Sequence, residues 1–308
     1  MELLEPKRRN NITWETSPML DAINAVLEQL HDYLPVSLRT IHYNLLNAPP
    51  PINAKHPKVL YANEQWCNRH LVDVAMRGRV LRLIDEDAIS DETRPIATWN
   101  TYADADEFRA AQNEQYLVGY ARDLMRSQPD HLELLVEKNT VANLLDAVAG
   151  QYCIPMTSGR GFASYPPRRD MRNRFKASGK ARLVLVVVSD FDAAGETIAE
   201  SYARSMRDDF GIDNIVPVKA ALTHEQVKTM RLEKSVEKKE ASTHAKYFER
   251  MYGRRQACYE LEALPPATLQ AVVRASIEAK LDMKLLQKEL RREAAERKAL
   301  ARERRRLV

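Results

Sequence analysis

The sequence predicts a mixed α/β protein in which a small helical domain precedes a mainly parallel β-sheet covered by helices on both faces. Three observations lead to this fold class. Short apolar runs alternate with helical patterns through the second half of the chain, and the run from Leu183 to Val188 is continuously apolar, as in a strand buried on both faces. The first half instead contains short segments with helical spacing of apolar residues.

The first domain is expected over residues 18–97, after an N-terminal extension of residues 1–17. Three helices are predicted, over residues 18–32, 37–46 and 62–77. Ser37 is placed to cap the second helix and Gly78 to end the third. Residues 79–84 and 89–95 are expected to pair as a basic hairpin. Three short helices followed by a hairpin predict a winged helix-turn-helix, a domain type that binds DNA.

The second domain is expected over residues 130–265, after a polar connector at residues 98–129. Its strands are predicted at residues 132–136, 154–157, 182–188 and 215–218, and its helices at residues 141–149 and 193–210. A charged insertion is expected at about residues 225–255. Residues 266–308 are expected to form a C-terminal helix and a basic tail.

Composition argues against several classes of protein. The three cysteines of the 308 residues lie far apart without a C-x-x-C pair, which argues against a disulfide framework and a structural zinc site. The longest apolar run is too short to span a bilayer, so we expect a cytoplasmic protein without a membrane partner. From Lys284 onward, ten basic residues face four glutamates, although the whole chain carries a net charge of only +4. This tail could add salt-sensitive DNA affinity or contact a partner protein, and the sequence leaves both open.

Carboxylates gather where two predicted strands end. Asp190 and Asp192 follow the apolar run, and Glu137 ends the first predicted strand of the second domain. Ligands of open α/β sheets bind at the carboxyl ends of the strands, and clustered carboxylate oxygens suit Mg²⁺, with Mn²⁺ as a substitute. The alternative is that the acids cap the following helix. Gly195 is expected to permit close packing at the start of that helix.

The motifs resemble a known family. A Glu ending one strand, followed about fifty residues later by D-x-D-x-x-G after an apolar strand, resembles the Toprim domain of type IIB topoisomerases, gyrase-type enzymes and primases. Three further segments are similar to the topoisomerase VI A subunit and occur in the same order: 136–139 (VEKN), 158–162 (SGRGF) and 259–264 (YELEAL). The chain departs from the D-G-D-P-x-G pattern of the family at Phe191 and Ala193.

The resemblance also implies a nucleophile. In the topoisomerase VI A subunit and the meiotic double-strand-break protein, a winged helix before Toprim carries a tyrosine in a motif like R-[DE]-[IL]-[YF]-Y. The matching segment here is R-T-I-H-Y at residues 39–43, which aligns Tyr43 with the nucleophile and Arg39 with the family's arginine. Arg39 would favour the phenolate and stabilise the transition state. Thr40 and His42 depart from the family motif, and a structural role for Tyr43 remains an alternative.

DNA contacts are expected from basic residues of the third helix and the hairpin, and from the glycine-rich loop. These residues are Arg69, Arg77, Arg79, Arg82 and Arg160. The resemblance further implies double-stranded DNA as substrate, a homodimer that combines the tyrosine of one protomer with the metal site of the other, and an ATPase or SMC-like partner subunit.

Three functions stay open at this stage. The first is Mg²⁺-dependent DNA cleavage by tyrosine transesterification, which leaves a 5′-phosphotyrosine link. The second is a Toprim nuclease that cleaves by hydrolysis, as in the nuclease subunit of SMC-like plasmid-defence systems. The third is a DNA-binding or scaffold protein without catalysis, against which the three intact acids argue.

Overall fold

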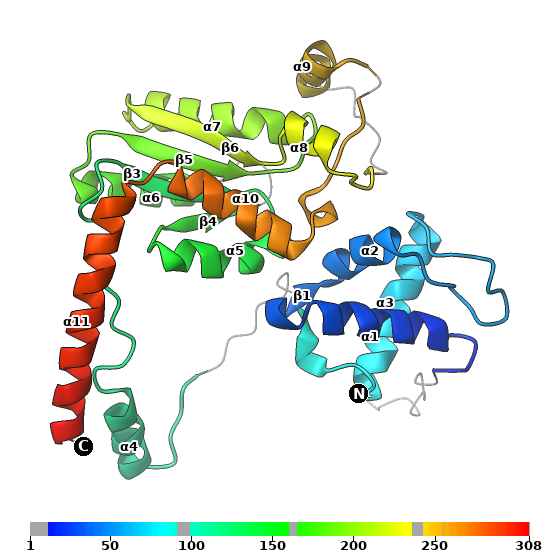
Figure 1. Ribbon diagram of the computed structural model, residues 1–308, viewed down its shortest axis with the longest axis horizontal. Helices are drawn as coiled ribbons and strands as arrows, with labels where there is room; N and C mark the ends of the chain where they lie inside the picture. The colour runs from blue at the N-terminus through cyan, green and yellow to red at the C-terminus, as the bar shows by residue number, and fades with distance from the viewer. Residues whose placement is uncertain (1–11, 91–98, 160–164, 236–242, 255, 308) are drawn as a thin grey trace, which may run out of the picture.

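The N-terminal part of the chain is built from helices (Figure 1). The structure is a computed structural model that describes residues 12–90, 99–159, 165–235, 243–254 and 256–307. Its first elements are α1 (Ser17–Gln29), β1 (Val36–Ser37), α2 (Leu38–Asn47), α3 (Gln65–Val80) and β2 (Ile89–Ser90), with 3₁₀ turns at His31–Tyr33 and Glu86–Ala88. As expected, Ser37 caps α2: its hydroxyl oxygen accepts a hydrogen bond from the Thr40 amide at 3.1 Å.

The expected hairpin after α3 is wrong for the residues that the structure describes. Arg79 belongs to α3, and β2 pairs in parallel with β1 instead of pairing with residues 79–84. Residues 91–98 lie outside the described part of the chain. Gly78 does not end the helix: a Cβ atom there would lie 2.6 Å from Cδ1 of Ile84, so glycine lets the chain after α3 fold back against it. The winged helix is therefore not established.

The second half of the chain forms the predicted parallel sheet. Its elements are β3 (His131–Val136), α5 (Asn139–Gln151), β4 (Met156–Ser158), α6 (Tyr165–Ser178), β5 (Leu183–Val188), α7 (Gly195–Asp208) and β6 (Ile215–Ala221). The strand order is β4-β3-β5-β6, and every neighbouring pair is parallel. The fold class is thus mixed α/β, as the sequence predicted.

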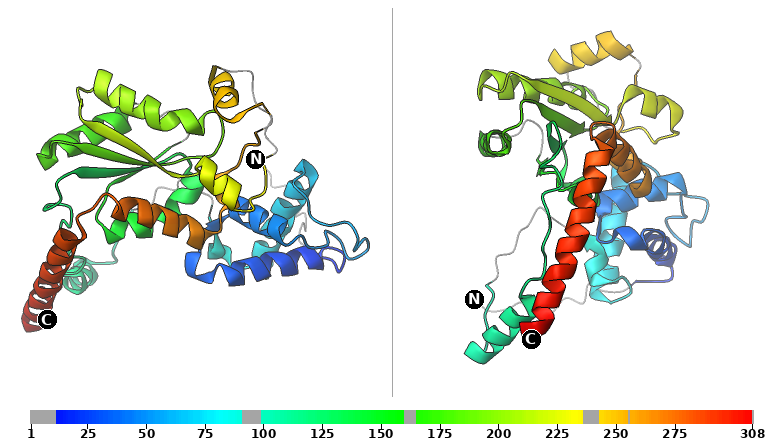
Figure 2. Two further views of the ribbon diagram at one scale, coloured as in Figure 1. Left: turned by 45° about the horizontal axis from the view of Figure 1, so that its top comes forward. Right: turned by 60° about the vertical axis from the view of Figure 1, so that its left-hand side comes forward.

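Helices cover both faces of this sheet, as Figures 1 and 2 show. On one face, α5 and α10 (Pro266–Glu278) pack on side chains such as Leu134 and Val186. On the other face, α6 and α7 pack on alternate residues such as Leu185 and Val187. Because successive side chains of a strand point to opposite faces, the continuous apolar run of β5 supplies both cores.

Four further helices and a 3₁₀ turn complete the described part of the chain. They are α4 (Ala105–Gln115), α8 (His224–Thr229), α9 (Thr243–Tyr252) and α11 (Met283–Leu307), and a 3₁₀ turn spans Leu261–Ala263. Helix α11 projects away from the sheet and runs alongside the connector that contains α4 (Figure 2). Arg122 of this connector pairs with Glu289 of α11 at 2.6 Å. Across the described residues, no helix combines the length and apolar character needed to cross a bilayer.

Candidate active site at the carboxyl edge of the sheet

The sheet brings Glu137 and Asp190 together. Val136 of β3 and Val188 of β5 are partners in the parallel register, so the residues that follow the two strands emerge side by side. The Glu137 amide donates to the Val188 carbonyl at 2.9 Å, and the Asp190 amide donates to Oε2 of Glu137 at 3.0 Å. These two predicted site residues therefore share the carboxyl edge of the two central strands.

Asp192 lies at the start of α7. Its Oδ1 accepts a hydrogen bond from the Gly195 amide at 2.6 Å, so this acid does stabilise the beginning of the helix, as the alternative interpretation held. Gly195 is required sterically, because a Cβ atom there would lie 2.1 Å from the Asp190 carbonyl oxygen. The hydroxyl of Ser189 donates to the Gly195 carbonyl at 2.9 Å. Together these contacts fold the chain tightly from Asp190 to Gly195.

Crowded negative charge marks this edge. Burial raises the pKa of Glu137, and the nearby Asp192 carboxylate adds to that effect. Burial also raises the pKa of Asp190 to about 8; Lys138 opposes this shift, while the carboxylates of Glu137 and Glu262 add to it. Carboxylates that raise each other's pKa gain from a neighbouring cation.

The donor set of this edge fits a divalent cation, although the acids contact other partners in this structure. No three His, Cys, Asp or Glu side chains of the described residues are grouped as ligands of one ion. The reason is visible in the contacts: Oδ2 of Asp190 lies 2.6 Å from the Lys138 ammonium, and its Oδ1 accepts from the Leu261 amide at 2.9 Å. Carboxylate oxygens with mutual repulsion are nevertheless the donors that Mg²⁺ prefers.

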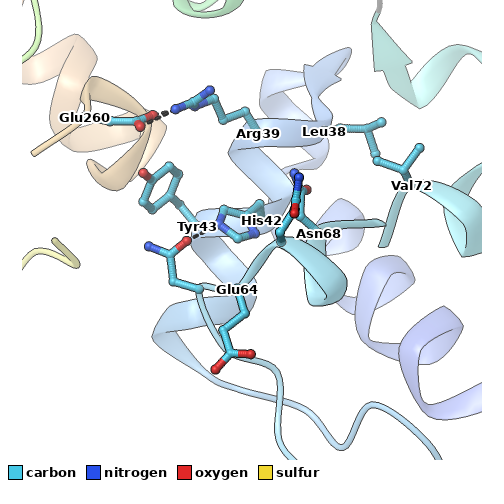
Figure 3. A pocket seen from close by; sticks show the side chains of 10 residues that line it. Leu38, Arg39, His42, Tyr43, Glu64, Asn68, Val72 and Glu260 are labelled. Carbon is cyan, nitrogen blue, oxygen red and sulfur yellow. Dashed lines mark hydrogen bonds and ion pairs between the residues drawn. The ribbon is translucent and has the colours of Figure 1, made fainter. Parts of the chain in front are cut away.

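An ion-pair network connects this edge to the helical part of the same chain. Besides Asp190, the Lys138 ammonium lies 3.3 Å from Oε2 of Glu260 and 3.2 Å from Oε2 of Glu262. Arg39 of α2 pairs with Glu260, as Figure 3 shows. The Nε of Arg39 also lies 3.7 Å from Oε1 of Glu262. The sequence motifs contained Lys138 and the two glutamates but did not indicate that they pair.

Tyr43 lines a pocket of about 620 Å³ beside this network. Figure 3 shows Tyr43 and Arg39 extending from α2 towards the segment that carries Glu260. The Tyr43 side chain is buried, and burial together with Glu260 raises its pKa, whereas Arg39 lowers it. Arg39 thus acts in the predicted direction, but its effect is outweighed. Glu260 and Glu262 overcome the effect of burial on Arg39 and raise the pKa of its guanidinium.

His42 is held by other partners. The amide nitrogen of Asn63 donates to the Lys234 carbonyl at 3.1 Å, which directs its Oδ1 to Nε2 of His42 at 3.2 Å. Nε2 therefore carries the proton, and Nδ1 accepts from the Tyr61 hydroxyl at 2.6 Å. Burial lowers the pKa of His42. Both ring nitrogens of His42 are thus hydrogen-bonded to Tyr61 and Asn63 and not to Tyr43.

Comparisons with known proteins leave the family open. The chain matches no protein-family model, and it gave no match among curated proteins or among solved structures. The resemblance to Toprim proteins therefore rests on the short motifs, and the function must be argued from the residues.

The predicted DNA-binding arginines occupy different environments. Arg69 of α3 is exposed, whereas Arg77 pairs with Asp73 at 2.9 Å and Arg82 with Glu86 at 3.6 Å. These arginines lie on α3 or directly after it, together with Arg79, whose Nη1 donates to the Ile89 carbonyl at 3.5 Å. Arg160 lies outside the described residues.

A second ion pair lies behind the carboxylate edge and was also missed by the sequence analysis. Lys219 of β6 pairs with Glu196 of α7 and donates to the Asp190 carbonyl at 3.0 Å. The Tyr252 hydroxyl donates to Oε2 of Glu196 at 2.6 Å. Phe191 packs between these groups and stacks on His224, with ring centroids 5.7 Å apart. Phe191, which also packs against the ring of Tyr252, thus connects α8 and α9 to the loop of acids.

Proposed function

We propose that this protein cleaves DNA strands in a metal-dependent reaction at the edge formed by Glu137, Asp190 and Asp192. The observation that carries the proposal is the meeting of Glu137 and Asp190 at the ends of the two central strands, next to the network that reaches Arg39 on the helix of Tyr43. This combination supports the resemblance to Toprim proteins of the topoisomerase VI A type.

Mg²⁺, or Mn²⁺ in its place, would be held by Glu137, Asp190 and Asp192. When bound, the metal ion would neutralise phosphate charge and stabilise the departing oxygen. Asp190 and Glu137 are oriented for this role by main-chain hydrogen bonds, because the Leu261 amide donates to Asp190 and the Asp190 amide donates to Glu137. These donors fix the carboxylates on rigid strand ends, as a precise site requires.

Tyr43 is the proposed nucleophile. Its oxygen would form a bond to the DNA phosphorus while the bond from phosphorus to the 3′ oxygen breaks; the phenol loses its proton and the departing 3′ oxygen gains one. The product is a 5′-phosphotyrosine link and a free 3′ hydroxyl. Because Tyr43 is buried and lines the same pocket as Arg39 and Glu260, DNA would have to reach the phenol through that pocket. Arg39 would then contact the attacked phosphate.

The second candidate is hydrolysis at the same carboxylates. The observation that favours it is the state of Tyr43, whose burial and raised pKa make it a poor nucleophile in this arrangement. In that reaction a water molecule attacks the phosphorus, the bond to one DNA oxygen breaks, and both ends are free of protein. The acids Glu137, Asp190 and Asp192 serve both candidates.

Duplex DNA is the proposed substrate, and Arg69, Arg77, Arg79 and Arg82 are its proposed contacts near α3. The ion pairs of Arg77 and Arg82 with acids of the same chain leave Arg69 as the residue best placed to reach a phosphate. A homodimer and an ATPase or SMC-like subunit follow from the resemblance alone.

A covalent-adduct assay separates the two candidates. Linearised, end-labelled plasmid is incubated with the protein and Mg²⁺ or Mn²⁺, and the reaction is stopped with detergent. Transesterification predicts DNA-linked protein that disappears in Tyr43→Phe. The matched control is Tyr61→Phe, which removes another buried phenolic hydroxyl and should keep the adduct. If both variants make metal-dependent cuts whose DNA ends carry no protein, the nucleophile is water and not Tyr43.

A further inference from the structure

Lys138 occupies the centre of the acidic edge. Its ammonium lies 2.6 Å from Asp190, 3.2 Å from Glu262 and 3.3 Å from Glu260, so one cation serves three carboxylates. The lysine side chain is only 22% exposed and that of Asp190 8%. The shortest of these contacts is to an oxygen of Asp190, one of the acids proposed to hold the metal.

Two cations close to one carboxylate oxygen repel each other, and the other oxygen of Asp190 already accepts from the Leu261 amide. A divalent ion that binds Oδ2 of Asp190 would therefore compete with the ammonium of Lys138 for that oxygen. An ammonium left without a partner in a site of this burial would be strongly destabilised. Glu260 and Glu262 remove that difficulty, because both already lie within reach of the ammonium and can keep it paired.

Glu262 is prepared for this exchange by its surroundings. The Thr140 hydroxyl donates to Oε1 of Glu262 at 2.7 Å and holds that carboxylate in place, while its other oxygen faces Lys138. Glu260 is shared between Lys138 and Arg39. A stronger contact from Lys138 to Glu260 would compete with Arg39. Metal binding would therefore weaken the contact between Glu260 and Arg39 of α2.

We infer that Lys138 is an internal counter-ion that holds Asp190 while the metal is absent and moves onto Glu260 and Glu262 when a divalent metal binds. The inference rests on the proposed metal-dependent function. Lys138 would thereby control the affinity for the metal. Glu260 would couple the movement of Lys138 to its own contact with Arg39. Lys138 is accordingly a positioning residue and not a ligand.

Metal affinity measured without DNA tests the inference. The purified full-length chain is titrated with Mn²⁺, and free Mn²⁺ is followed by electron paramagnetic resonance. Lys138→Met removes the competing cation and should tighten Mn²⁺ binding about tenfold, the factor expected for one charge-assisted hydrogen bond. Lys138→Gln, which removes the charge but keeps hydrogen bonding, should tighten it in the same direction. Circular dichroism establishes that each variant is folded.

Lys219→Met is the matched control. Lys219 is also a lysine beside these acids, but its ammonium contacts the main-chain oxygen of Asp190 and the Glu196 carboxylate. Its removal changes the local charge equally without vacating a carboxylate oxygen of Asp190. The gain in Mn²⁺ affinity should therefore be smaller than in Lys138→Met, because only the through-space charge effect is removed.

The outcomes separate the inference from the proposed function. Tighter Mn²⁺ binding in Lys138→Met than in Lys219→Met supports the inference. If wild-type protein binds Mn²⁺, Asp190→Asn abolishes that binding, and the Lys138 variants bind no more tightly than Lys219→Met, the counter-ion role is overturned while the metal site stands. If neither the wild-type chain nor any Lys138 variant binds Mn²⁺, both are overturned.

Discussion

Replacing Gly195 by alanine tests the packing that shapes the carboxylate edge. A Cβ atom at this position would lie 2.1 Å from the Asp190 carbonyl oxygen and 2.9 Å from its carbonyl carbon. These neighbours are main-chain atoms directly after β5, so they cannot rotate away as the end of a side chain can. Overpacking of this kind costs about 1–3 kcal/mol, and a main-chain neighbour places Gly195→Ala near 3 kcal/mol of lost stability.

Gly150 provides the control for this substitution. It lies near the end of α5, where a Cβ atom would meet nothing within 4 Å. Alanine favours helix over glycine, so Gly150→Ala should stabilise the protein by roughly 0.5 kcal/mol. Urea unfolding followed by circular dichroism gives both free energies, with midpoints compared at equal slope.

The two variants should therefore differ in sign. Gly195→Ala should also weaken Mn²⁺ binding, since α7 can retreat from β5 only by moving Asp192, which binds its first amide. Equal stability of Gly195→Ala and Gly150→Ala would refute the close approach between α7 and the Asp190 carbonyl, and with it the described shape of the loop.

Three further predictions concern charge. Glu133 is fully buried and forms two hydrogen bonds of 2.8 Å with Arg174, while His131 lies 2.9 Å from one of its oxygens. Arg174→Met leaves His131 as a partner and should destabilise the fold by about 2 kcal/mol. The exposed Arg169→Met should stay within about 0.5 kcal/mol in the same urea assay. Burial raises the pKa of Asp190 and the Lys138 ammonium opposes that shift, so protons compete with metal for this carboxylate at the acid end of the range. Mn²⁺ affinity should therefore rise with pH, and calorimetric titrations between pH 6 and pH 8 that show no such rise would contradict the assignment. Arg69→Ala should lower DNA affinity and reduce the slope of log affinity against log salt by about 0.9 in fluorescence anisotropy, and an unchanged slope would exclude a phosphate contact.

The parallel sheet and its carboxylate edge were accessible from the sequence because they depend on local signals. The β-branched run of β5 predicts a buried strand, and acids directly after neighbouring parallel strands must emerge at one edge. The hydrogen bond from Asp190 to Glu137 follows from that register. The cap of α2 by Ser37 was predictable for the same reason, since capping involves residues three apart.

Other features depend on contacts that sequence patterns do not encode. Lys138 and Glu260 are 122 positions apart, so the local pattern of neither segment indicates that they pair. Helix α6 was missed because Tyr165 is followed by two prolines, which resemble a break but are tolerated in the first turn of a helix. The hairpin was wrongly predicted because Gly78, expected as a helix end, instead permits contact with Ile84.

The most direct test of the account is cleavage of supercoiled plasmid by the purified chain, with Mg²⁺ or Mn²⁺ and with EDTA, in wild type and in Asp190→Asn. Asp146→Asn, which neutralises an exposed acid of α5, is the control for a change of one charge. We predict metal-dependent nicked or linear plasmid for wild type and Asp146→Asn and intact plasmid for Asp190→Asn. Cleavage by Asp190→Asn at the wild-type rate, or cleavage that persists in EDTA, would contradict a metal-dependent reaction at the carboxylate edge.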